Sequence, residues 1–308
     1  MTEYFGPVLA IMRADTLEEA LEIQNAVEFG LTAGIHSLDS DEIAYWLDHV
    51  QAGNVYINRG ITGAIVRRQP FGGWKRSQVG TGSKAGGPNH LIGLMKVAPA
   101  QRSTSYEGEL DSLHYATLDA LDALHEKIDD DGAEDFRYAL RSVQDALDDV
   151  YLAEVDISGL GVEKNVFRYR PTEVLARIED PADWWKAAPM LAGAADGGTT
   201  VTLSVGDDLR DTVAQALRAG GIRVLTESTE DWLADLASDP TAFRKIRYFG
   251  DDARGVAEAV DGSVDVAIYS DPATLNGRVD LRPFFLEQAV AATNHRFGDH
   301  TRVLDGVI

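Results

Sequence analysis

Residues 54–88 read NVYINRGITGAIVRRQPFGGWKRSQVGTGSKAGGP. A short apolar strand pattern runs here into a long loop that is rich in glycine and cations. A loop of this length without its own periodicity is usually functional or disordered, and Phe71 and Trp74 argue against disorder. Glycine lets backbone N–H groups come close to a ligand, and clustered N–H groups bind anions such as carboxylate or phosphate. Two interpretations stay open at this point, an anion-binding loop and a glycine-rich surface loop.

The residues before this loop alternate between strand and helix patterns. We expect strands over 7–12, 31–36 and 53–58, and helices over 17–29 and from Ser40 or Asp41 to residue 50. Thr16 and Glu19 form a capping-box pattern at the start of the first helix. Strands that alternate with helices pair in parallel through right-handed crossovers, so this part is predicted to be an α/β unit.

A less regular region follows the loop. Residues 88–97 are apolar and read as a strand or an extended segment, whereas residues 98–112 are polar and read as a linker. Two helices are expected next, over 113–128 and 134–151. The three aspartates between them, residues 129–131, lack the alternating spacing and the distant glutamate of a calcium loop. An acidic helix-capping turn is therefore favoured over a metal site.

Strand and helix patterns alternate again from residue 165, which indicates a second α/β unit resembling a doubly wound sheet. We expect strands at 165–170, 199–204, 222–225, 245–249 and 264–269, and helices at 184–195, 207–219, 229–237 and 252–260. No Gly-x-Gly-x-x-Gly joins a strand to the next helix, and Gly193, Gly197 and Gly198 fall at a helix end. We therefore expect no dinucleotide in this second unit.

Composition limits the class of protein. A chain of 308 residues that is 44% hydrophobic can form one large or two ordinary domains. It has no cysteine, which excludes disulfides, thiolate metal sites and a cysteine nucleophile among these residues. Its seven histidines form no His-x-x-x-His pair, so no metal site is expected. No apolar run approaches about 18 residues and no signal-like segment is present, so we expect a soluble cytoplasmic protein without membrane association.

The net charge of -22 is unevenly distributed. Residues 1–97 hold 8 Lys and Arg against 10 Asp and Glu, which leaves -2. The remaining 211 residues hold 20 against 40, which leaves -20 and supports a boundary near residue 97. Because an acidic surface repels nucleic acid, we expect no nucleic-acid partner.

Four motifs, in order, resemble the aldehyde dehydrogenase superfamily. Residues 70–73, Pro-Phe-Gly-Gly, are similar to its signature, and residues 3–8, EYFGPV, are similar to its Glu-x-Phe-Gly-Pro-Val element. LTAGIHS at 31–37 and AGN at 52–54 fit the separation of these two motifs. The longer pattern TGAIV…QPFGG, residues 62–73, resembles one branch, the L-glutamate γ-semialdehyde dehydrogenases. Four motifs in order are much stronger evidence than one.

This resemblance implies roles for five residues and NAD as the cofactor. Glu3 corresponds to the glutamate that accepts hydrogen bonds from the nicotinamide-ribose hydroxyls, and Phe5 lies beside the nicotinamide. Gly63 and Ala64 correspond to an anchor whose backbone N–H groups hold the α-carboxylate of the substrate. Phe71 corresponds to the aromatic residue that packs on the aliphatic part of the substrate. Taken alone, Glu3 is an exposed terminal acid and Phe71 is a hydrophobic anchor of its own loop.

The same resemblance implies that the chain is inactive by itself. The family uses a cysteine thiolate, which attacks the aldehyde carbonyl before hydride passes to the nicotinamide. In relatives, this nucleophile and most of the dinucleotide-binding domain precede the Glu-x-Phe-Gly-Pro-Val element. The missing N-terminal catalytic half is therefore the expected partner, in cis or in trans.

The tail, residues 277–298, resembles the C-terminal segment of the long bifunctional proline utilisation A flavoenzymes. These enzymes fuse proline dehydrogenase to the semialdehyde dehydrogenase, so FAD is implied only for a proline dehydrogenase domain that is absent here. LGVEKN at 160–165 is similar to the entry of their extra C-terminal domain, an inactive copy of the dehydrogenase fold. The resemblance implies that the tail packs against the catalytic unit.

The residues of the tail, read by themselves, predict a helix. Pro283 suits its first turn, and its apolar face is formed by Phe284, Phe285, Ala289 and Ala292. His295 and its neighbour Arg296 are cations that suit a helix C-terminus, so a general-base role for His295 is not favoured.

The expected fold is α/β. Residues 1–97 form the distal half of an aldehyde dehydrogenase catalytic domain, residues 98–158 a linker with helices, and residues 159–308 a second, degenerate Rossmann-like domain. The expected function is that of the C-terminal portion of an L-glutamate γ-semialdehyde (1-pyrroline-5-carboxylate) dehydrogenase of proline catabolism, which oxidises the semialdehyde to glutamate with NAD when complete. The alternative is a non-catalytic scaffold derived from that enzyme, and a homo-oligomer stays open.

Overall fold

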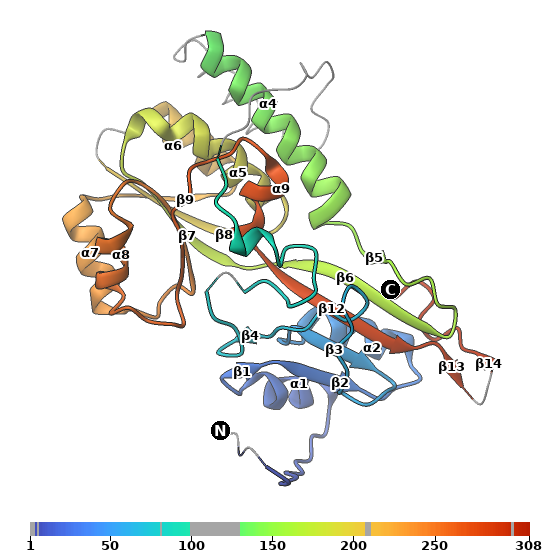
Figure 1. The fold of residues 1–308 in the computed structure, drawn as a ribbon. Helices are drawn as coiled ribbons and strands as arrows, with labels where there is room; N and C mark the ends of the chain where they lie inside the picture. Colours follow the sequence, from blue (N-terminus) through green and yellow to red (C-terminus); the bar gives the residue numbers. More distant parts are fainter. Residues whose placement is uncertain (1–3, 5, 81, 99–129, 207–210, 297–298) are drawn as a thin grey trace.

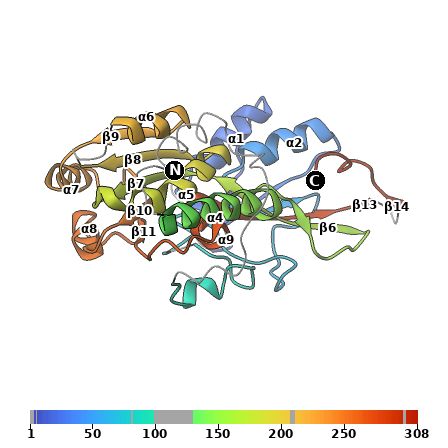
Figure 2. The same cartoon turned by 90° about the horizontal axis from the view of Figure 1, so that it is seen from above.

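The computed structural model of the chain describes residues 4, 6–80, 82–98, 130–206, 211–296 and 299–308. Two five-stranded sheets organise these residues (Figure 1). One sheet carries the glycine-rich loop, and the other is layered between helices (Figure 2). The predicted α/β class is confirmed.

The first sheet combines residues from distant parts of the chain in the order β2-β3-β12-β6-β5. Its strands are β2 (Thr32–Ile35), β3 (Asn54–Ile57), β12 (Phe285–Thr293), β6 (Glu163–Pro171) and β5 (Val155–Asp156). β3 pairs in parallel with β2 and with β12, whereas β12 pairs antiparallel with β6 along its whole length. The sheet therefore crosses the boundary expected near residue 97.

The helix predicted for the tail is wrong, because this segment is the central strand β12. Pro283 lies in one short helical turn, η5 (Arg282–Phe284), after which the chain extends. β12 is buried along nearly all of its length between β3 and β6. An apolar run that is buried on both faces looks alike in sequence whether it is a strand or a helix, so periodicity does not distinguish them.

Two helices, α1 (Leu17–Asn25) and α2 (Ser40–His49), pack against the first sheet and form its core. Thr16 caps α1 as predicted, because its hydroxyl accepts the N–H of residue 19 at 3.2 Å. The helix ends at residue 25, four residues before the predicted end. Asp39, the residue before the two predicted candidates, caps α2 by accepting two backbone N–H groups.

The second sheet is entirely parallel in the order β11-β10-β7-β8-β9. Its strands are β7 (Glu173–Ile178), β8 (Thr200–Val205), β9 (Arg223–Thr226), β10 (Lys245–Phe249) and β11 (Ala267–Tyr269). Numbered from β7, the order is 3-2-1-4-5, as in the doubly wound dinucleotide-binding folds. The predicted Rossmann-like architecture is confirmed. The sequence pattern does not predict β7 itself, because only Thr172 separates it from β6.

Helices cover both faces of the second sheet (Figure 2). One face is packed by α4 (Asp130–Ala146), α5 (Trp184–Asp196) and α6 (Asp211–Ala219), and the other by α7 (Thr229–Ser238) and α8 (Ala253–Ala259). Side chains of β7 alternate accordingly, with Val174 and Ala176 facing the first group and Leu175 facing the second. This unit therefore has a core of its own.

One predicted strand of the first 97 residues is wrong. Residues 7–12 form no strand in the described structure, and the side chains of Leu9 and Ile11 are 84% and 82% exposed. The segment 88–97, expected as a strand or an extended segment, forms no strand; it contains the short helical turn η1 (Ile92–Leu94), after which the backbone of Met95 is extended. Both segments are apolar without a neighbouring strand to pair with in the described part of the chain.

The remaining elements are short. They are β1 (Phe29–Gly30), β4 (Trp74–Lys75), the π-helical turn η3 (Leu147–Tyr151), η4 (Pro181–Asp183), α9 (Gly277–Asp280), β13 (His295–Arg296) and β14 (Asp299–His300). α4 begins four residues before its predicted start, and the helix predicted over 113–128 lies outside the described residues. None of the helices described is both long and apolar enough to cross a bilayer.

Candidate functional site

The glycine-rich loop is held by its own backbone after it leaves β3. Ile65 and Gln69 close a tight turn through two mutual backbone hydrogen bonds of 3.1 and 2.7 Å. Phe71 and Ala85 pair in the same way at 3.0 and 2.9 Å. Further along, β4 pairs antiparallel with β1. The loop is therefore ordered, which favours a functional loop.

Gly63 and Ala64 are exposed and lie directly before the tight turn that Ile65 and Gln69 close; we call residues 63–69 the anchor turn. Gly63 has a φ of +127°, a conformation that side chains disfavour, and its carbonyl accepts a 2.8 Å hydrogen bond from the Tyr56 hydroxyl. Among the residues that the structure describes, no acceptor receives a hydrogen bond from the N–H of Gly63 or Ala64. The turn therefore presents two unused N–H donors, which suit a carboxylate.

Gln69 explains why a side chain is excluded at residue 63. It is only 2% exposed, and its amide nitrogen donates to the side-chain oxygen of Asn165 at 2.9 Å. Its amide oxygen lies 3.2 Å from the place that a Cβ on Gly63 would occupy. Any side chain at this position would therefore meet both the unfavourable φ and a buried amide.

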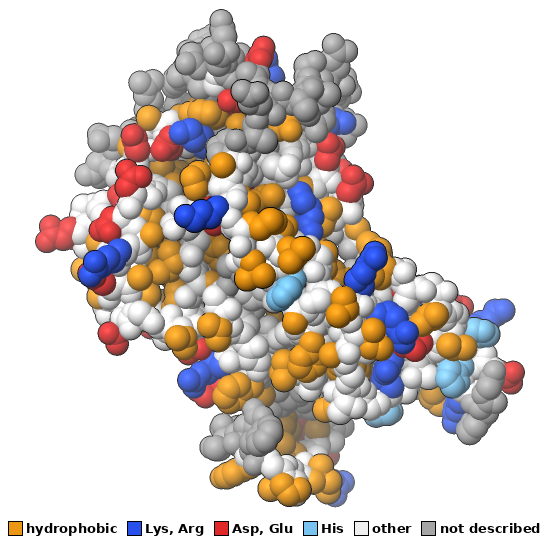
Figure 3. Space-filling view, in the orientation of Figure 1, with side chains coloured by type: hydrophobic (Ala, Val, Ile, Leu, Met, Phe, Trp, Pro, Cys, Tyr) orange, Lys and Arg blue, Asp and Glu red, His pale blue; other side chains and the backbone are white. Residues whose placement is uncertain are grey.

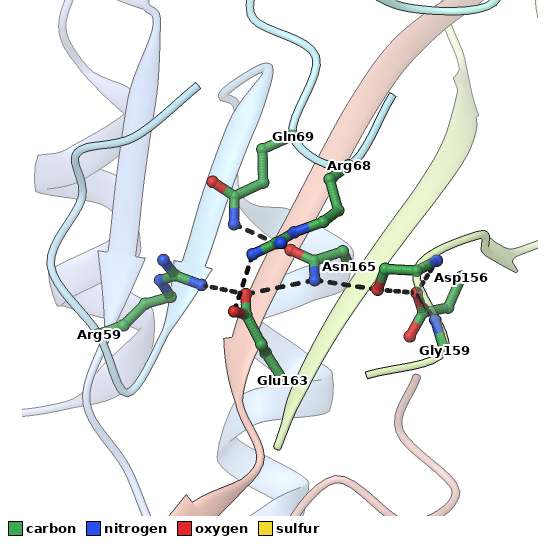
Figure 4. Close-up of polar contacts among 8 residues, drawn as sticks. Arg59, Arg68, Gln69, Asp156, Gly159, Glu163 and Asn165 are labelled. Carbon is green, nitrogen blue, oxygen red and sulfur yellow. Dashed lines mark hydrogen bonds and ion pairs between the residues drawn. The ribbon is translucent and has the colours of Figure 1, made fainter. Parts of the chain in front are cut away.

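Glu163, the first residue of β6, joins the two ends of this part of the loop (Figure 4). One carboxylate oxygen binds Arg59 at 3.1 Å and the other binds Arg68 at 2.9 Å. The amide of Asn165 donates to Glu163 at 3.3 Å and to the hydroxyl of Ser158 at 3.1 Å. Burial raises the pKa of Glu163, but Asn165 and the two guanidiniums outweigh it and hold the pKa below its usual value. We call Arg59, Glu163 and Arg68 the Glu163 cluster.

Lys84 and Asn54 hold the Pro-Phe-Gly-Gly segment through hydrogen bonds to its backbone. The Lys84 side chain is buried, and its nitrogen donates to the Asn54 side chain at 3.1 Å and to the Gly72 carbonyl. Asn54 in turn donates to the Pro70 carbonyl at 2.9 Å and accepts the Gly72 N–H at 3.1 Å. Burial lowers the pKa of Lys84 to about 7. Phe71, which is half-buried, is therefore fixed through both of its neighbours.

Glu287 connects the tail strand β12 to the loop. Its buried carboxylate accepts the backbone N–H of Lys84 at 2.8 Å and the side-chain amide of Asn89 at 2.7 Å. Its main-chain carbonyl accepts the indole N–H of Trp74 at 2.8 Å. The tail thus packs against the loop, as the resemblance implies.

The predicted site residues fall into two groups. Gly63, Ala64 and Phe71 lie in the same ordered loop, with the first two at its exposed turn. Glu3 and Phe5 lie outside the described residues. In the described part of the chain, no group of three or more His, Cys, Asp or Glu side chains is arranged to hold a metal ion.

Sequence reasoning missed three charged residues that position the loop, namely Lys84, Glu163 and Glu287. Glu287 carried a usable signal, because it interrupts an apolar run and a buried charge persists only with partners. Glu163 carried none, since its partners Arg59 and Arg68 are about a hundred residues away in sequence.

The second unit differs from a dinucleotide site at the carboxyl end of β7, where doubly wound folds bind pyrophosphate. Arg177 is 1% exposed there, and it binds Glu179 at 3.2 Å and the Ser204 hydroxyl at 2.8 Å. The turn from β7 to α5 contains Glu179, Asp180 and Asp183 in place of a glycine-rich phosphate loop. These carboxylates would repel a pyrophosphate, and the absence of a dinucleotide here stays a prediction.

Comparison with known proteins relates this geometry to one family. Residues 1–97 match the aldehyde dehydrogenase family. The bifunctional protein PutA of Rhizobium meliloti is 32% identical over 236 residues, which are 76% of this chain and 18% of that protein. The 1-pyrroline-5-carboxylate dehydrogenase of Geobacillus sp. (strain WCH70) is 49% identical over 90 residues, which are 29% of this chain and 17% of that protein.

Among solved structures, proline utilization A (PutA) from Corynebacterium freiburgense has 37% sequence identity and a TM-score of 0.69. The match covers 96% of this chain and 26% of that one, so both units and the shared sheet have a counterpart in a single protein. The chain spans less than a fifth of the length of the curated relatives it matches.

Proposed function

We propose, from the membership of residues 1–97 in the aldehyde dehydrogenase family, that this chain is the C-terminal portion of an L-glutamate γ-semialdehyde (1-pyrroline-5-carboxylate) dehydrogenase. The likeness to PutA over nearly the whole chain supports a bifunctional enzyme of proline catabolism as the parent protein. The complete enzyme would oxidise the aldehyde group of the semialdehyde to the side-chain carboxylate of glutamate.

In this proposal the chain supplies the residues that bind and orient the substrate. The free N–H groups of Gly63 and Ala64 bind the α-carboxylate, and Phe71 packs on the aliphatic carbons between the carboxylate and the aldehyde. The Glu163 cluster closes the ends of the anchor turn, while Lys84 fixes the turn that carries Phe71. These contacts orient the aldehyde and leave the bond-making step to other groups.

The described residues supply neither the nucleophile nor the contacts to the cofactor in this proposal. NAD supplies the hydride acceptor when it is bound, and we place Glu3 and Phe5 beside its nicotinamide end. The second unit does not fit NAD, for the reasons of charge given above. The 308 residues contain no cysteine, so the nucleophile would come from an N-terminal catalytic half, in cis or in trans.

Exposed apolar side chains support such a partner. Leu9, Ile11, Ile65 and Val66 are all 45% or more exposed. Figure 3 shows hydrophobic side chains exposed at several places on one face of the molecule. Large exposed apolar patches mark interaction sites, and an N-terminal half would cover such side chains. We also propose a cytoplasmic location for the complete enzyme.

The exposed turn with two unused N–H donors is the observation that carries the proposal. The test joins this chain to the N-terminal half of a related dehydrogenase and follows NAD reduction with L-glutamate γ-semialdehyde. Gly63→Ala should raise KM at least about tenfold, because a Cβ at a φ of +127° shifts the anchor. Ala64→Ser keeps the backbone N–H and should leave KM unchanged.

Two results would decide against the proposal. Equal KM values for Gly63→Ala and Ala64→Ser in an active assembly would refute the assignment of Gly63 and Ala64 as the anchor of the substrate carboxylate. A stable assembly without turnover, although the partner half carries its cysteine, would favour the non-catalytic scaffold.

A further inference from the structure

A cavity lies where the loop meets β5, β6 and the turn η3 after α4, and neither Gly63 nor Ala64 lines it. Its volume is about 460 Å³, within the range of small-molecule pockets. The walls are mostly apolar and include Val155, Phe167 and Tyr169. The rings of Phe167 and Tyr169 meet edge to face with centroids 5.3 Å apart, so this wall is rigid and aromatic.

Two arginines line this cavity, Arg67 exposed and Arg278 half-buried, and neither forms an ion pair with any residue that the structure describes. Arg67 holds a left-handed backbone conformation with a φ of 67°, fixed by its N–H bond to the Gly86 carbonyl at 2.9 Å. In the described part of the chain its guanidinium has no hydrogen-bond or ion-pair partner. Arg278 donates to the Asn89 side chain at 2.6 Å and to the Tyr151 hydroxyl at 3.4 Å, both of which are neutral.

The other charge on the lining is Asp149, which is exposed and forms an ion pair with neither arginine. Two arginines left without a carboxylate are informative in a chain whose net charge is -22, since acidic side chains are abundant. Arginine forks bind carboxylates through paired hydrogen bonds, and an apolar wall beside them reduces the competition from water.

We propose that this cavity binds a small carboxylic acid with an apolar body. Its carboxylate lies between Arg67 and Arg278, and its body packs on Phe167 and Tyr169. Apolar α-amino acids belong to this class, and Asp149 would accept their ammonium group. This site does not depend on the dehydrogenase function proposed above.

Hydrogen bonds connect the cavity to the glycine-rich loop. Arg278 binds Asn89, Asn89 binds the Glu287 carboxylate, and Glu287 binds the N–H of Lys84. An acid bound to Arg278 would therefore be linked through these hydrogen bonds to residues 84–89. Binding should slow amide hydrogen exchange in this segment.

The test titrates the 308-residue chain calorimetrically with 3-phenylpropionate, with L-phenylalanine and with the uncharged 3-phenylpropan-1-ol. We expect saturable binding of at least one acid and much weaker binding of the alcohol. Arg67→Gln should weaken the acid about tenfold or more, because it removes a charged donor. The variant should fold normally, since the guanidinium it replaces has no partner among the described residues.

Arg76→Gln is the matched control, because Arg76 belongs to the same loop but pairs with Glu28 and Asp265 away from the cavity. Val155→Glu provides a second variant, which places a carboxylate in the half-exposed wall and should abolish binding. The proposal is overturned if neither acid binds saturably, if the alcohol binds as well as the acids, or if Arg67→Gln and Arg76→Gln weaken binding equally.

Discussion

Replacing Glu163 with glutamine should loosen the anchor turn without unfolding the chain. The carboxylate joins Arg59 on one side of residues 60–67 to Arg68 on the other. Glutamine keeps the size of the side chain and one acceptor oxygen, but it leaves two neighbouring guanidiniums without a counter-charge. The turn should therefore open more often, while both cores keep their packing.

The size of this effect follows from the exposure of the three side chains. Glu163 is 23% exposed, Arg59 25% and Arg68 32%, so the cluster lies between a surface pair and a buried one. Exposed pairs contribute about 0–1 kcal/mol, whereas breaking a fully buried pair costs about 3–5 kcal/mol. Because glutamine retains part of the hydrogen bonding, we expect a local loss of about 1–2 kcal/mol, or a roughly 5- to 30-fold larger open population.

Amide hydrogen exchange measured by mass spectrometry would report this population directly. The N–H groups of Arg67 and Gln69 are bonded within the loop, and they should exchange faster by that factor in Glu163→Gln. Asp48→Asn is the control, because it breaks the Arg170–Asp48 pair, which also joins β6 to the first 97 residues. Unchanged exchange at residues 60–69, or an equal change in the control, would refute the reasoning.

Measuring amide exchange in the wild-type chain and in Glu163→Gln at several pH values gives an independent check. The pKa of Glu163 is lowered in the folded chain, so its stabilisation is complete above the usual value of 4.5 and is lost as the pH falls through the folded value. The difference in amide exchange rate at residues 60–69 between the wild-type chain and Glu163→Gln should therefore be constant near neutral pH and disappear in acid.

Three further predictions concern the rest of the chain. Burial lowers the pKa of Lys245 to about 7, whereas the unfolded chain keeps 10.5, so the unfolded state binds more protons between these values and the free energy of unfolding should rise with pH there. Lys245→Met should remove the contribution of Lys245 to that rise and leave the contribution of Lys84, whose pKa burial also lowers to about 7, as measured by urea unfolding at several pH values. A chain that stops at residue 276 lacks β12, so its first sheet should not form and its thermal transition in circular dichroism should be reduced to that of the second unit, whereas a transition of native size would contradict the shared sheet. NAD should not shift the thermal midpoint of the 308-residue chain, although a ligand at about 100 times its dissociation constant adds roughly 2.7 kcal/mol, so an upward shift would reveal a working nucleotide site.

The sequence patterns predict most of the second unit and much less of the first sheet. Strands such as β8 and β10 are short apolar runs between helices with clear boundaries, so their type and order follow from local signals. β12 lacks such a signal, because it is apolar on both faces and its neighbours β3 and β6 come from distant parts of the chain. Local periodicity contains no information on which strand lies beside which.

The candidate site shows the same division. Gly63, Ala64 and Phe71 could be proposed because glycine-rich loops have a recognisable pattern and this one resembles a family motif. The partners of the charged residues that hold the loop could not be predicted: the apolar run around Glu287 signals that this charge needs a partner, but which groups meet Glu163 and Glu287 is decided only when folding places them beside the loop. Tertiary packing decides which charges meet, and neither spacing nor propensity reveals it.

The position of β12 has a consequence for how the chain folds. Gln288 in this strand bonds to the Ala52 carbonyl across 236 residues, so the first sheet closes only after nearly the whole chain has been made. At about 5–20 residues per second, residues near Ala52 leave the ribosome roughly 10–50 s before their partner strand exists. The second unit, whose strands pair through short crossovers, can fold during that wait, whereas β3 remains with an open, apolar edge. Slow folding and aggregation should therefore be most sensitive to substitutions in β12, even where those substitutions barely change the final stability.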